Sequence, residues 1–246
     1  MKKTNVLDIL FVSFIFLFFV SFPFDLWIKN SFYLYLAETL ARLIFVVFLL
    51  MYNHFKKLVT IPICHFKKTD LLLLPLLPIL FCNFYYLLEM RNGFRITLDE
   101  TFFIQIVFQI SVALSEELLF RSLIQNCLSL KKDLTRIFVS SLIFALFHLT
   151  YFFSSFNLIS LFIPLYTFGL GFLLGFIYEW SEKNFLYICG CHFLFNLINQ
   201  VLYTYMLNVG ENYLFYVNAV CVGAFGAVYL IFLLFLSKRV NKSFQR

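Results

Sequence analysis

The chain has 246 residues, of which 62% are hydrophobic and 37 are phenylalanine, whereas only 13% carry a formal charge. Soluble domains average about 45–50% apolar and about 25% charged residues, so the composition excludes an ordinary soluble domain and a disordered chain. The net charge of +6 comes from short basic clusters between apolar runs, which argues against nucleic-acid binding. The sequence therefore predicts an all-α, polytopic membrane protein that forms a single domain over residues 1–246.

Eight apolar runs follow one another along the chain and predict about eight transmembrane helices. Most are long enough to cross a hydrocarbon core of about 30 Å, which takes roughly 20 helical residues. The third and fifth runs are the shortest, and Pro75 and Pro78 are expected to kink the third. The runs are residues 9–28, 33–53, 71–88, 101–126, 137–153, 157–180, 185–208 and 213–236.

Basic residues mark the loops that are expected to face the cytoplasm. Lys and Arg cluster at residues 2–3, 56–57, 67–68, 131–132 and 238–239, on alternate sides of successive runs. Cytoplasmic loops carry the excess of Lys and Arg in membrane proteins, so the pattern predicts that both termini are cytoplasmic. Because the composition looks bacterial, we expect a bacterial plasma membrane. No small-residue cleavage site follows the first run, which predicts an uncleaved first helix.

Charged side chains inside apolar runs are costly and are therefore candidate functional residues. Glu38 and Arg42 in the second run are four residues apart, which predicts a self-neutralised pair on one helix face. Glu117 and Arg121 in the fourth run have the same spacing and the same predicted pairing. Glu116 points about 100° away from Glu117 and has no predicted partner, which makes it the more informative carboxylate.

Two later runs contribute imidazole and amide groups. His148 lies in the fifth run, and the seventh run carries a polar stripe at steps of three and four residues: Cys189, His192, Asn196, Asn199 and Tyr203. At 1.5 Å per residue, Glu116, His148 and His192 lie roughly 15, 17 and 10 Å from the inner ends of their runs. Their similar depths favour a common site for these three side chains. Interhelical hydrogen bonding is an alternative explanation for His192 and Asn196.

A carboxylate, two imidazoles and an amide suit hydrolysis. Glu116 could deprotonate a water held by His148, while His192 and Asn196 donate to the developing oxyanion. Alternatively, Glu116, His148 and His192 supply a His2Glu set for catalytic zinc. The residues do not choose between these two chemistries, and the HExxH and GxSxG motifs of other hydrolases are absent.

Three motifs in order resemble those of the CAAX protease and bacteriocin-processing family of intramembrane proteases (CPBP, also called Abi). They are Glu116-Glu117-xxx-Arg121, Phe144-xxx-His148 and His192-xxx-Asn196, and the motif-bearing core covers residues 100–200. The resemblance implies an eight-span helical core with a site open to the cytosol. It also implies that Glu116 and His148 activate water, that His192 and Asn196 bind the oxyanion, and that Glu117 and Arg121 give structural support.

The resemblance further implies an intramembrane endopeptidase that cleaves a membrane-associated peptide or protein near the cytoplasmic side, with peptide or bacteriocin maturation or immunity as the roles of bacterial members. We expect no required cofactor, with Zn²⁺ as the alternative; the expected partners are the lipid bilayer and the substrate, with no nucleic acid. The oligomeric state does not follow from the sequence. The alternative function is a non-catalytic membrane immunity or sensor-kinase-binding protein with the same fold. A proton-coupled carrier is less favoured because no internal repeat is evident.

Overall fold

The computed structural model describes residues 6–62, 98–128, 130, 132–150 and 162–197. Within these ranges the chain is helical and has no β-strand, which confirms the all-α class. The elements in chain order are α1 (Val6–Val20), the short 3-10 helix η1 (Phe24–Leu26), α2 (Ser31–Lys56), α4 (Glu100–Glu117), its π-helical continuation η3 (Leu118–Gln125), α5 (Asp133–Phe147), α7 (Phe162–Trp180) and α8 (Phe185–Asn196).

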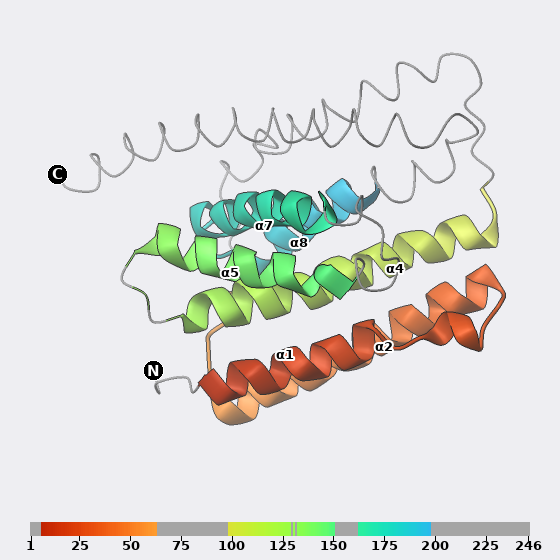
Figure 1. Ribbon diagram of the computed structural model, residues 1–246, viewed down its shortest axis with the longest axis horizontal. Coiled ribbons are helices and arrows are strands. Elements are labelled where there is room, and N and C mark those ends of the chain that lie inside the picture. Colours follow the sequence, from red (N-terminus) through yellow and green to blue (C-terminus); the bar gives the residue numbers. More distant parts are fainter. Residues whose placement is uncertain (1–5, 63–97, 129, 131, 151–161, 198–246) are drawn as a thin grey trace, which may run out of the picture.

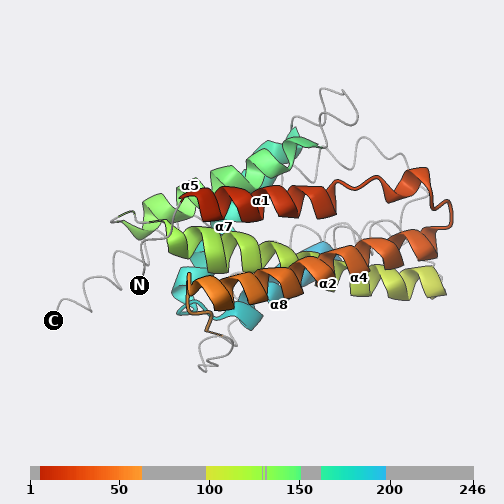
Figure 2. The same cartoon turned by 90° about the horizontal axis from the view of Figure 1, so that it is seen from below.

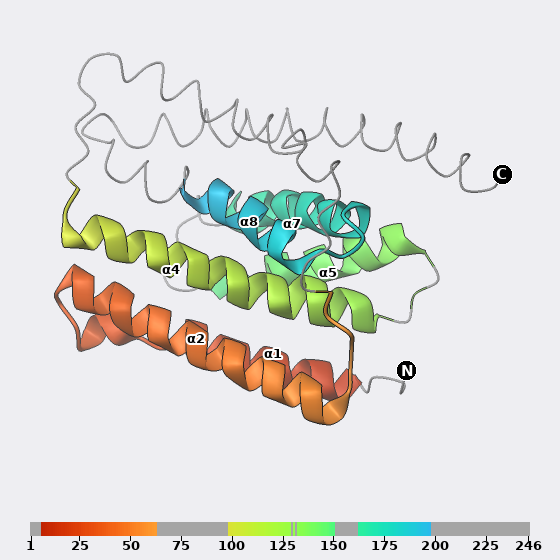
Figure 3. The same ribbon diagram turned by 180° about the vertical axis from the view of Figure 1, so that it is seen from behind.

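The helices form a layered bundle with α4 at its centre (Figure 1). The hairpin of α1 and α2 packs on one side of α4, and Figure 2 looks onto this hairpin from below. Helices α5, α7 and α8 cover the other side, and the view from behind shows α4 between α2 and α8 (Figure 3). The most extensive packing joins α5 to α7 and α2 to α4, so α4 contacts both halves of the described bundle.

Four helical stretches among the described residues are long and apolar enough to cross a membrane. They are Val6–Leu26, Ser31–Lys56, Glu100–Gln125 and Ile163–Trp180, and they correspond to the first, second, fourth and sixth predicted runs. The predicted runs 71–88 and 213–236 lie outside the described residues, as does the distal part of run 185–208. The count of eight spans therefore stays a prediction.

The helix of the fifth predicted run begins earlier than the prediction. Helix α5 spans Asp133–Phe147 and ends at His148, whereas the prediction covered residues 137–153. Hydropathy misses the start because Asp133 and Arg136 are charged, yet these two side chains pair with each other. His148 caps the end of α5, Leu149 and Thr150 are helical again, and the rest of the predicted run lies outside the described residues.

Three helices begin at side-chain caps. Asn30, Asp99 and Asn184 accept hydrogen bonds from the backbone N–H groups of Tyr33, Phe102 and Tyr187, respectively. Each cap satisfies one of the backbone donors that a helix start leaves without an intrahelical partner. The Asp99 cap defines where α4 begins, and the Asn184 cap does the same for α8. Both of these helices carry predicted site residues.

An aromatic cluster fastens the N-terminal hairpin to the central helix. The Phe16 ring on α1 lies 5.1 Å from Phe45 on α2 and 5.7 Å from Phe120 on η3, measured between centroids. Phe120 in turn lies 5.0 Å from Phe144 on α5 and 5.2 Å from Phe147. Rings at these separations contribute beyond the area that they bury, so the hairpin is an integral part of the bundle.

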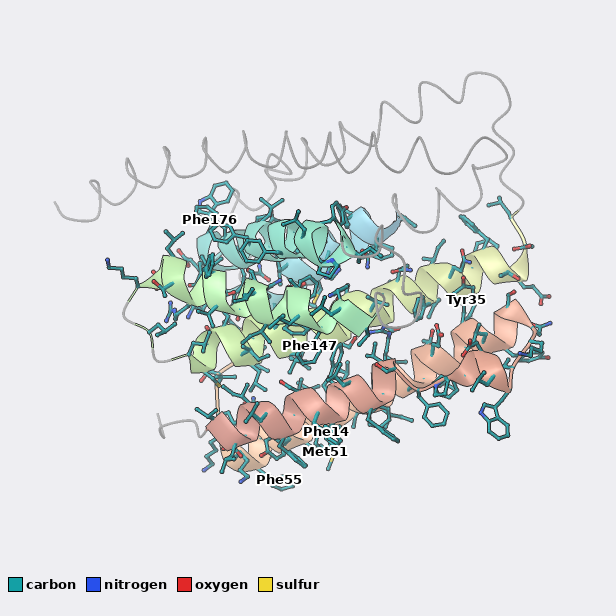
Figure 4. All side chains as sticks on the ribbon, viewed as in Figure 1. Phe14, Tyr35, Met51, Phe55, Phe147 and Phe176 are labelled. Atoms are coloured by element: carbon teal, nitrogen blue, oxygen red, sulfur yellow. The ribbon has the colours of Figure 1, made fainter. Side chains whose placement is uncertain are left out.

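The opposite face of the hairpin is apolar and exposed. Phe14, Met51 and Phe55 lie along the outer edge of α1 and α2 (Figure 4), and Phe14 and Phe55 are 69% and 75% exposed. A continuous exposed apolar face of this kind suits contact with lipid, because a soluble protein rarely tolerates one. The face therefore agrees with the membrane assignment made from the composition.

Two glycines let α7 pack closely against its neighbours, as the Gly171-xxx-Gly175 spacing predicts. A Cβ atom at Gly171 would lie 2.9 Å from Cδ1 of Phe144 and 3.4 Å from Nη2 of Arg121. A Cβ atom at Gly175 would lie 2.9 Å from Oε1 of Gln125. A side chain at either position would require these neighbours to shift, so the glycines let α7 lie close to the buried polar groups of η3.

We predict that Gly171→Ala lowers the stability of the folded protein by about 1–3 kcal/mol, because the added methyl group overpacks against the buried Phe144 ring. Gly169→Ala is the matched control: it lies on the same helix, and a Cβ atom there meets nothing within 4 Å. Thermal unfolding of the purified protein in detergent measures both variants. Equal melting temperatures for the two variants would contradict the close approach at Gly171.

Candidate active site

The two acidic residues of the first motif end the regular part of α4. Glu116 and Glu117 are its last residues, and η3 continues from Leu118 as a π-helix in which every residue is buried. Short π-helical segments inside α-helices are rare and frequent at functional sites. Both carboxylates are buried, with Glu116 7% and Glu117 0% exposed. Two adjacent acidic side chains inside an apolar bundle require partners from other positions.

Glu117 is held by two partners at once. Nε of Arg121 donates to Oε2 of Glu117 at 3.2 Å, which confirms the predicted i,i+4 ion pair. Nδ1 of His192 donates to Oε1 at 2.7 Å, a contact that the sequence did not predict. The carboxylate thus joins η3 to α8, and both of its oxygens accept a hydrogen bond.

Arg121 is itself fixed by residues of α5. Its Nη1 donates to Oγ of Ser140 at 3.3 Å, and its guanidinium carbon lies 5.2 Å from the centroid of the Phe144 ring. Nη2 is buried and has no hydrogen-bond partner within the described part of the chain. The guanidinium is completely buried, so its position is set by its neighbours and not by solvent.

Glu116 lies between a guanidinium and an imidazole. Its Oε1 is 3.6 Å from Nη1 of Arg42 on α2, and its Oε2 is 3.9 Å from Nε2 of His192. The expectation that Glu116 has no partner is therefore wrong: Arg42 forms its ion pair with Glu116, while its charge also acts on Glu38. An exposed i,i+4 pair contributes only about 0.2–0.5 kcal/mol, whereas an unpaired buried carboxylate is strongly destabilising, so Arg42 turns to α4.

His192 contacts both acidic residues through its two ring nitrogens. Because Nδ1 donates to Glu117, Nε2 is directed to the side of Glu116. A hydrogen bond at one imidazole nitrogen sets the orientation of the ring and the role of the other nitrogen. Glu116 and Glu117 point about 100° apart on their helix, and one imidazole from α8 contacts both of them. The geometry of α4 alone does not predict this contact.

Phe144 of the second motif contacts both imidazole rings. Its centroid lies 4.6 Å from that of His148 and 6.3 Å from that of His192. Nδ1 of His148 donates to the backbone carbonyl of Phe144 at 2.8 Å. In the neutral tautomer that this bond selects, Nε2 is the acceptor nitrogen. The Phe144 ring therefore packs against both histidines.

The remaining predicted residues fall into two groups. Asn196, from the polar stripe of the seventh run, is buried on α8, and Gln105 and Gln109 are buried on α4. Asn199 and Tyr203 lie outside the described residues.

Sequence reasoning missed the polar residues that support the motifs. Ser115 accepts from Arg42, and Ser140 donates to Oε1 of Gln125 at 3.1 Å. Gln125 donates in turn to Oε1 of Glu179 at 3.1 Å. The signal for Gln125 was present, because Glu117, Arg121 and Gln125 follow one another at i,i+4 spacing; the partners on α5 and α7 carry no comparable pattern.

The three side chains proposed as zinc ligands, Glu116, His148 and His192, do not converge on one position. Among the described residues, no group of three or more His, Cys, Asp or Glu side chains lies close enough to hold a metal ion. Glu116 faces a guanidinium, and Nδ1 of His192 is bonded to Glu117. A catalytic zinc site needs three converging protein donors, so the arrangement does not fit a His2Glu set.

Comparison with known proteins identifies the same segment as the motifs do. Residues 99–198 match the family model described as type II CAAX prenyl endopeptidase Rce1-like. The match includes all three motifs and leaves α1 and α2 outside. No curated protein and no solved structure matches the chain significantly.

We predict that Arg121→Met destabilises the protein by about 3–5 kcal/mol, because it leaves the buried Glu117 carboxylate without its cation. Adding Glu117→Gln should restore part of the loss, since the amide oxygen can still accept from His192 while the buried charge is gone. The measurement is a double-mutant cycle on thermal unfolding in detergent. Strictly additive effects would show that the two side chains do not act as a pair.

Proposed function

Because residues 99–198 form an Rce1-like domain of the CAAX protease family, we propose that this integral membrane protein is an intramembrane endopeptidase that uses Glu116 to activate water. The observation that carries the proposal is the buried Glu116 carboxylate 3.9 Å from Nε2 of His192, on a helix long and apolar enough to cross a membrane. A carboxylate inside a membrane span is costly, and at such a site it suits general-base catalysis.

In the proposed reaction, Glu116 accepts a proton from a water molecule that attacks the scissile carbonyl carbon. His148 helps to hold this water through Nε2, the acceptor nitrogen of the tautomer that its bond to Phe144 selects. The C–O bond forms, and the carbonyl oxygen becomes an oxyanion. When the C–N bond breaks, the proton passes from Glu116 to the leaving amine, so charge and protons balance.

His192 and Asn196 are the proposed oxyanion donors. Because Nδ1 of His192 already donates to Glu117, its Nε2 donates only when both ring nitrogens carry a proton, and we assign His192 that form. They lie one helical turn apart on α8, and both are buried. A donor is effective when its orientation is set before the reaction. The bond from Nδ1 of His192 to Glu117 supplies that orientation, and the Arg121–Glu117 pair keeps the acceptor in place. Glu117 and Arg121 thus support the site without touching substrate.

The proposed substrate is a membrane-associated peptide or protein cleaved near the cytoplasmic side of a bacterial plasma membrane. The buried site on apolar helices favours a substrate that is itself in the bilayer over a soluble one. Peptide or bacteriocin maturation or immunity is the role that we propose for it. The family model is named for prenylated CAAX tails, which makes a prenylated peptide a useful comparison substrate. A non-catalytic immunity or sensor-kinase-binding protein is the alternative.

We predict that Glu116→Gln removes the cleavage products that depend on this protein, because the amide cannot accept the proton of the water. Neo-termini of membrane and secreted peptides are quantified by mass spectrometry in cells with the wild-type protein, Glu116→Gln or a deletion. Glu100→Gln, at the exposed start of the same helix, is the matched control and should retain the wild-type termini.

The wild type, Glu116→Gln and Glu100→Gln must be present at matched protein levels. Termini that vanish equally in the deletion and in Glu116→Gln identify the substrate. If the deletion has a phenotype that Glu116→Gln does not share, and no terminus depends on Glu116, the endopeptidase proposal fails. The non-catalytic alternative then takes its place, and a binding partner becomes the object of the search.

We further propose that hydrolysis requires no metal ion, since Glu116 and His192 already bind a guanidinium and a carboxylate. A purified preparation incubated with a zinc chelator and then freed of it should cleave a peptide spanning the identified junction at the untreated rate. A loss of activity that added Zn²⁺ restores would contradict this part of the proposal and favour the metal-dependent chemistry.

A further inference from the structure

Arg42 is a buried cation on α2, a helix that lies outside the Rce1-like domain. It is 8% exposed and belongs to a stretch long and apolar enough to span the membrane. A cation at such a position is costly unless its partners compensate. The groups that contact Arg42 therefore indicate the role of this buried cation.

Among the described residues, the hydrogen bond, the ion pair and the ring contact of the Arg42 guanidinium all reach α4. Nη1 donates to Oγ of Ser115 at 3.3 Å and lies 3.6 Å from Oε1 of Glu116. The guanidinium carbon lies 5.4 Å from the centroid of the Phe108 ring. Ser115 itself donates to the backbone carbonyl of Val112 at 3.0 Å, so a lone pair of its oxygen is turned to Arg42.

Glu38 provides an internal comparison. It lies one turn before Arg42 on α2 and has the spacing of an intrahelical ion pair. Among the described residues, the ion pair that Arg42 forms is nevertheless with Glu116. The charge of Arg42 also acts on Glu38, but the cation makes its ion pair with the proposed catalytic carboxylate.

We propose that Arg42 is a positioning residue for Glu116, an inference that rests on the proposed function. Arg42 holds Oε1 of the carboxylate, which leaves Oε2 on the side of His192 where the water is to be activated. It acts through Glu116 and has no contact with substrate. Displacing a reacting group by about 1 Å can lower the rate about 100-fold. The rate gained by fixing the carboxylate oxygen therefore offsets the free-energy cost of burying the Arg42 cation.

One consequence concerns the division of the chain. The segment that matches the family carries Glu116, but the cation that holds it comes from the N-terminal hairpin. The hairpin is fastened by the contacts of the Phe16 ring with Phe120 on η3 and Phe147 on α5. The hairpin therefore completes the site and is more than a membrane anchor.

The test uses the purified full-length protein in lipid nanodiscs and a quenched-fluorescence peptide that spans the junction identified from the neo-termini. For Arg42→Gln we expect kcat to fall about 10- to 100-fold with KM within about twofold, because a positioning residue acts on the chemical step. Arg42→Lys keeps the cation and should recover part of kcat. Glu38→Gln is the control on the same helix and should match the wild type.

A double-mutant cycle with Ser115→Ala tests the contact itself. If Ser115 acts by holding the guanidinium, Ser115→Ala lowers kcat in the wild-type background and changes it little when Arg42 is already Gln. Melting temperatures of all variants show whether each is folded. Should Arg42→Gln fail to fold, Arg42→Lys and Ser115→Ala still decide the question through their kcat and KM values.

The outcomes separate this inference from the proposed function. If Glu116→Gln cleaves the peptide as the wild type does, the proposed function fails and the role of Arg42 fails with it. If Glu116→Gln is inactive while Arg42→Gln keeps the wild-type kcat, the endopeptidase stands and the inference is overturned. An equal loss of kcat in Glu38→Gln and Arg42→Gln also overturns it, because the effect would then belong to α2 as a whole.

Discussion

The burial of two adjacent carboxylates in an apolar helix bundle is the constraint on which the rest of this structure depends. A buried ion pair is costly to break, because removing one partner leaves an uncompensated charge in a low dielectric. Glu117 meets this constraint through Arg121 and His192, and Glu116 meets it through Arg42 and the far nitrogen of the same imidazole. Each partner reaches the carboxylates from a defined direction, so electrostatic compensation fixes how η3, α8 and α2 are arranged around α4.

The polar network continues from the site toward one end of the bundle. Arg121 bonds to Ser140, Ser140 to Gln125, and Gln125 to Glu179, which also lies 3.4 Å from Arg136. These contacts tie η3, α5 and α7 together in a region where lipid or apolar side chains could not satisfy the groups. The glycines at 171 and 175 make the network possible, because side chains there would occupy the space of Phe144 and Gln125. The close packing of α7 therefore places the buried polar groups within hydrogen-bonding distance of one another.

In this arrangement, the side chains proposed to carry out the hydrolysis are already held in position. Preorganised groups stabilise a transition state without reorganising during the reaction, and His192 is held at one nitrogen while its other nitrogen faces Glu116. His148 differs from His192, because it ends α5 and its Nδ1 is bonded to a backbone carbonyl rather than to a carboxylate. The two imidazoles share the Phe144 ring but have different hydrogen-bond environments, which agrees with the separate roles proposed for them.

The sequence by itself determined the class of the protein and the identity of its unusual residues, because apolar composition and charges within apolar runs are readable without coordinates. It also determined the Glu117–Arg121 pair, whose partners lie on one helix face at fixed spacing. Only the tertiary structure decided that Arg42 forms its ion pair with Glu116, that His192 bridges both acids, and that His148 ends α5. Helix periodicity fixes which residues share a face, but it says nothing of helix rotation or neighbours. A buried charge takes its partner from whichever helix packs against it, and that choice is made by the packing of the whole bundle.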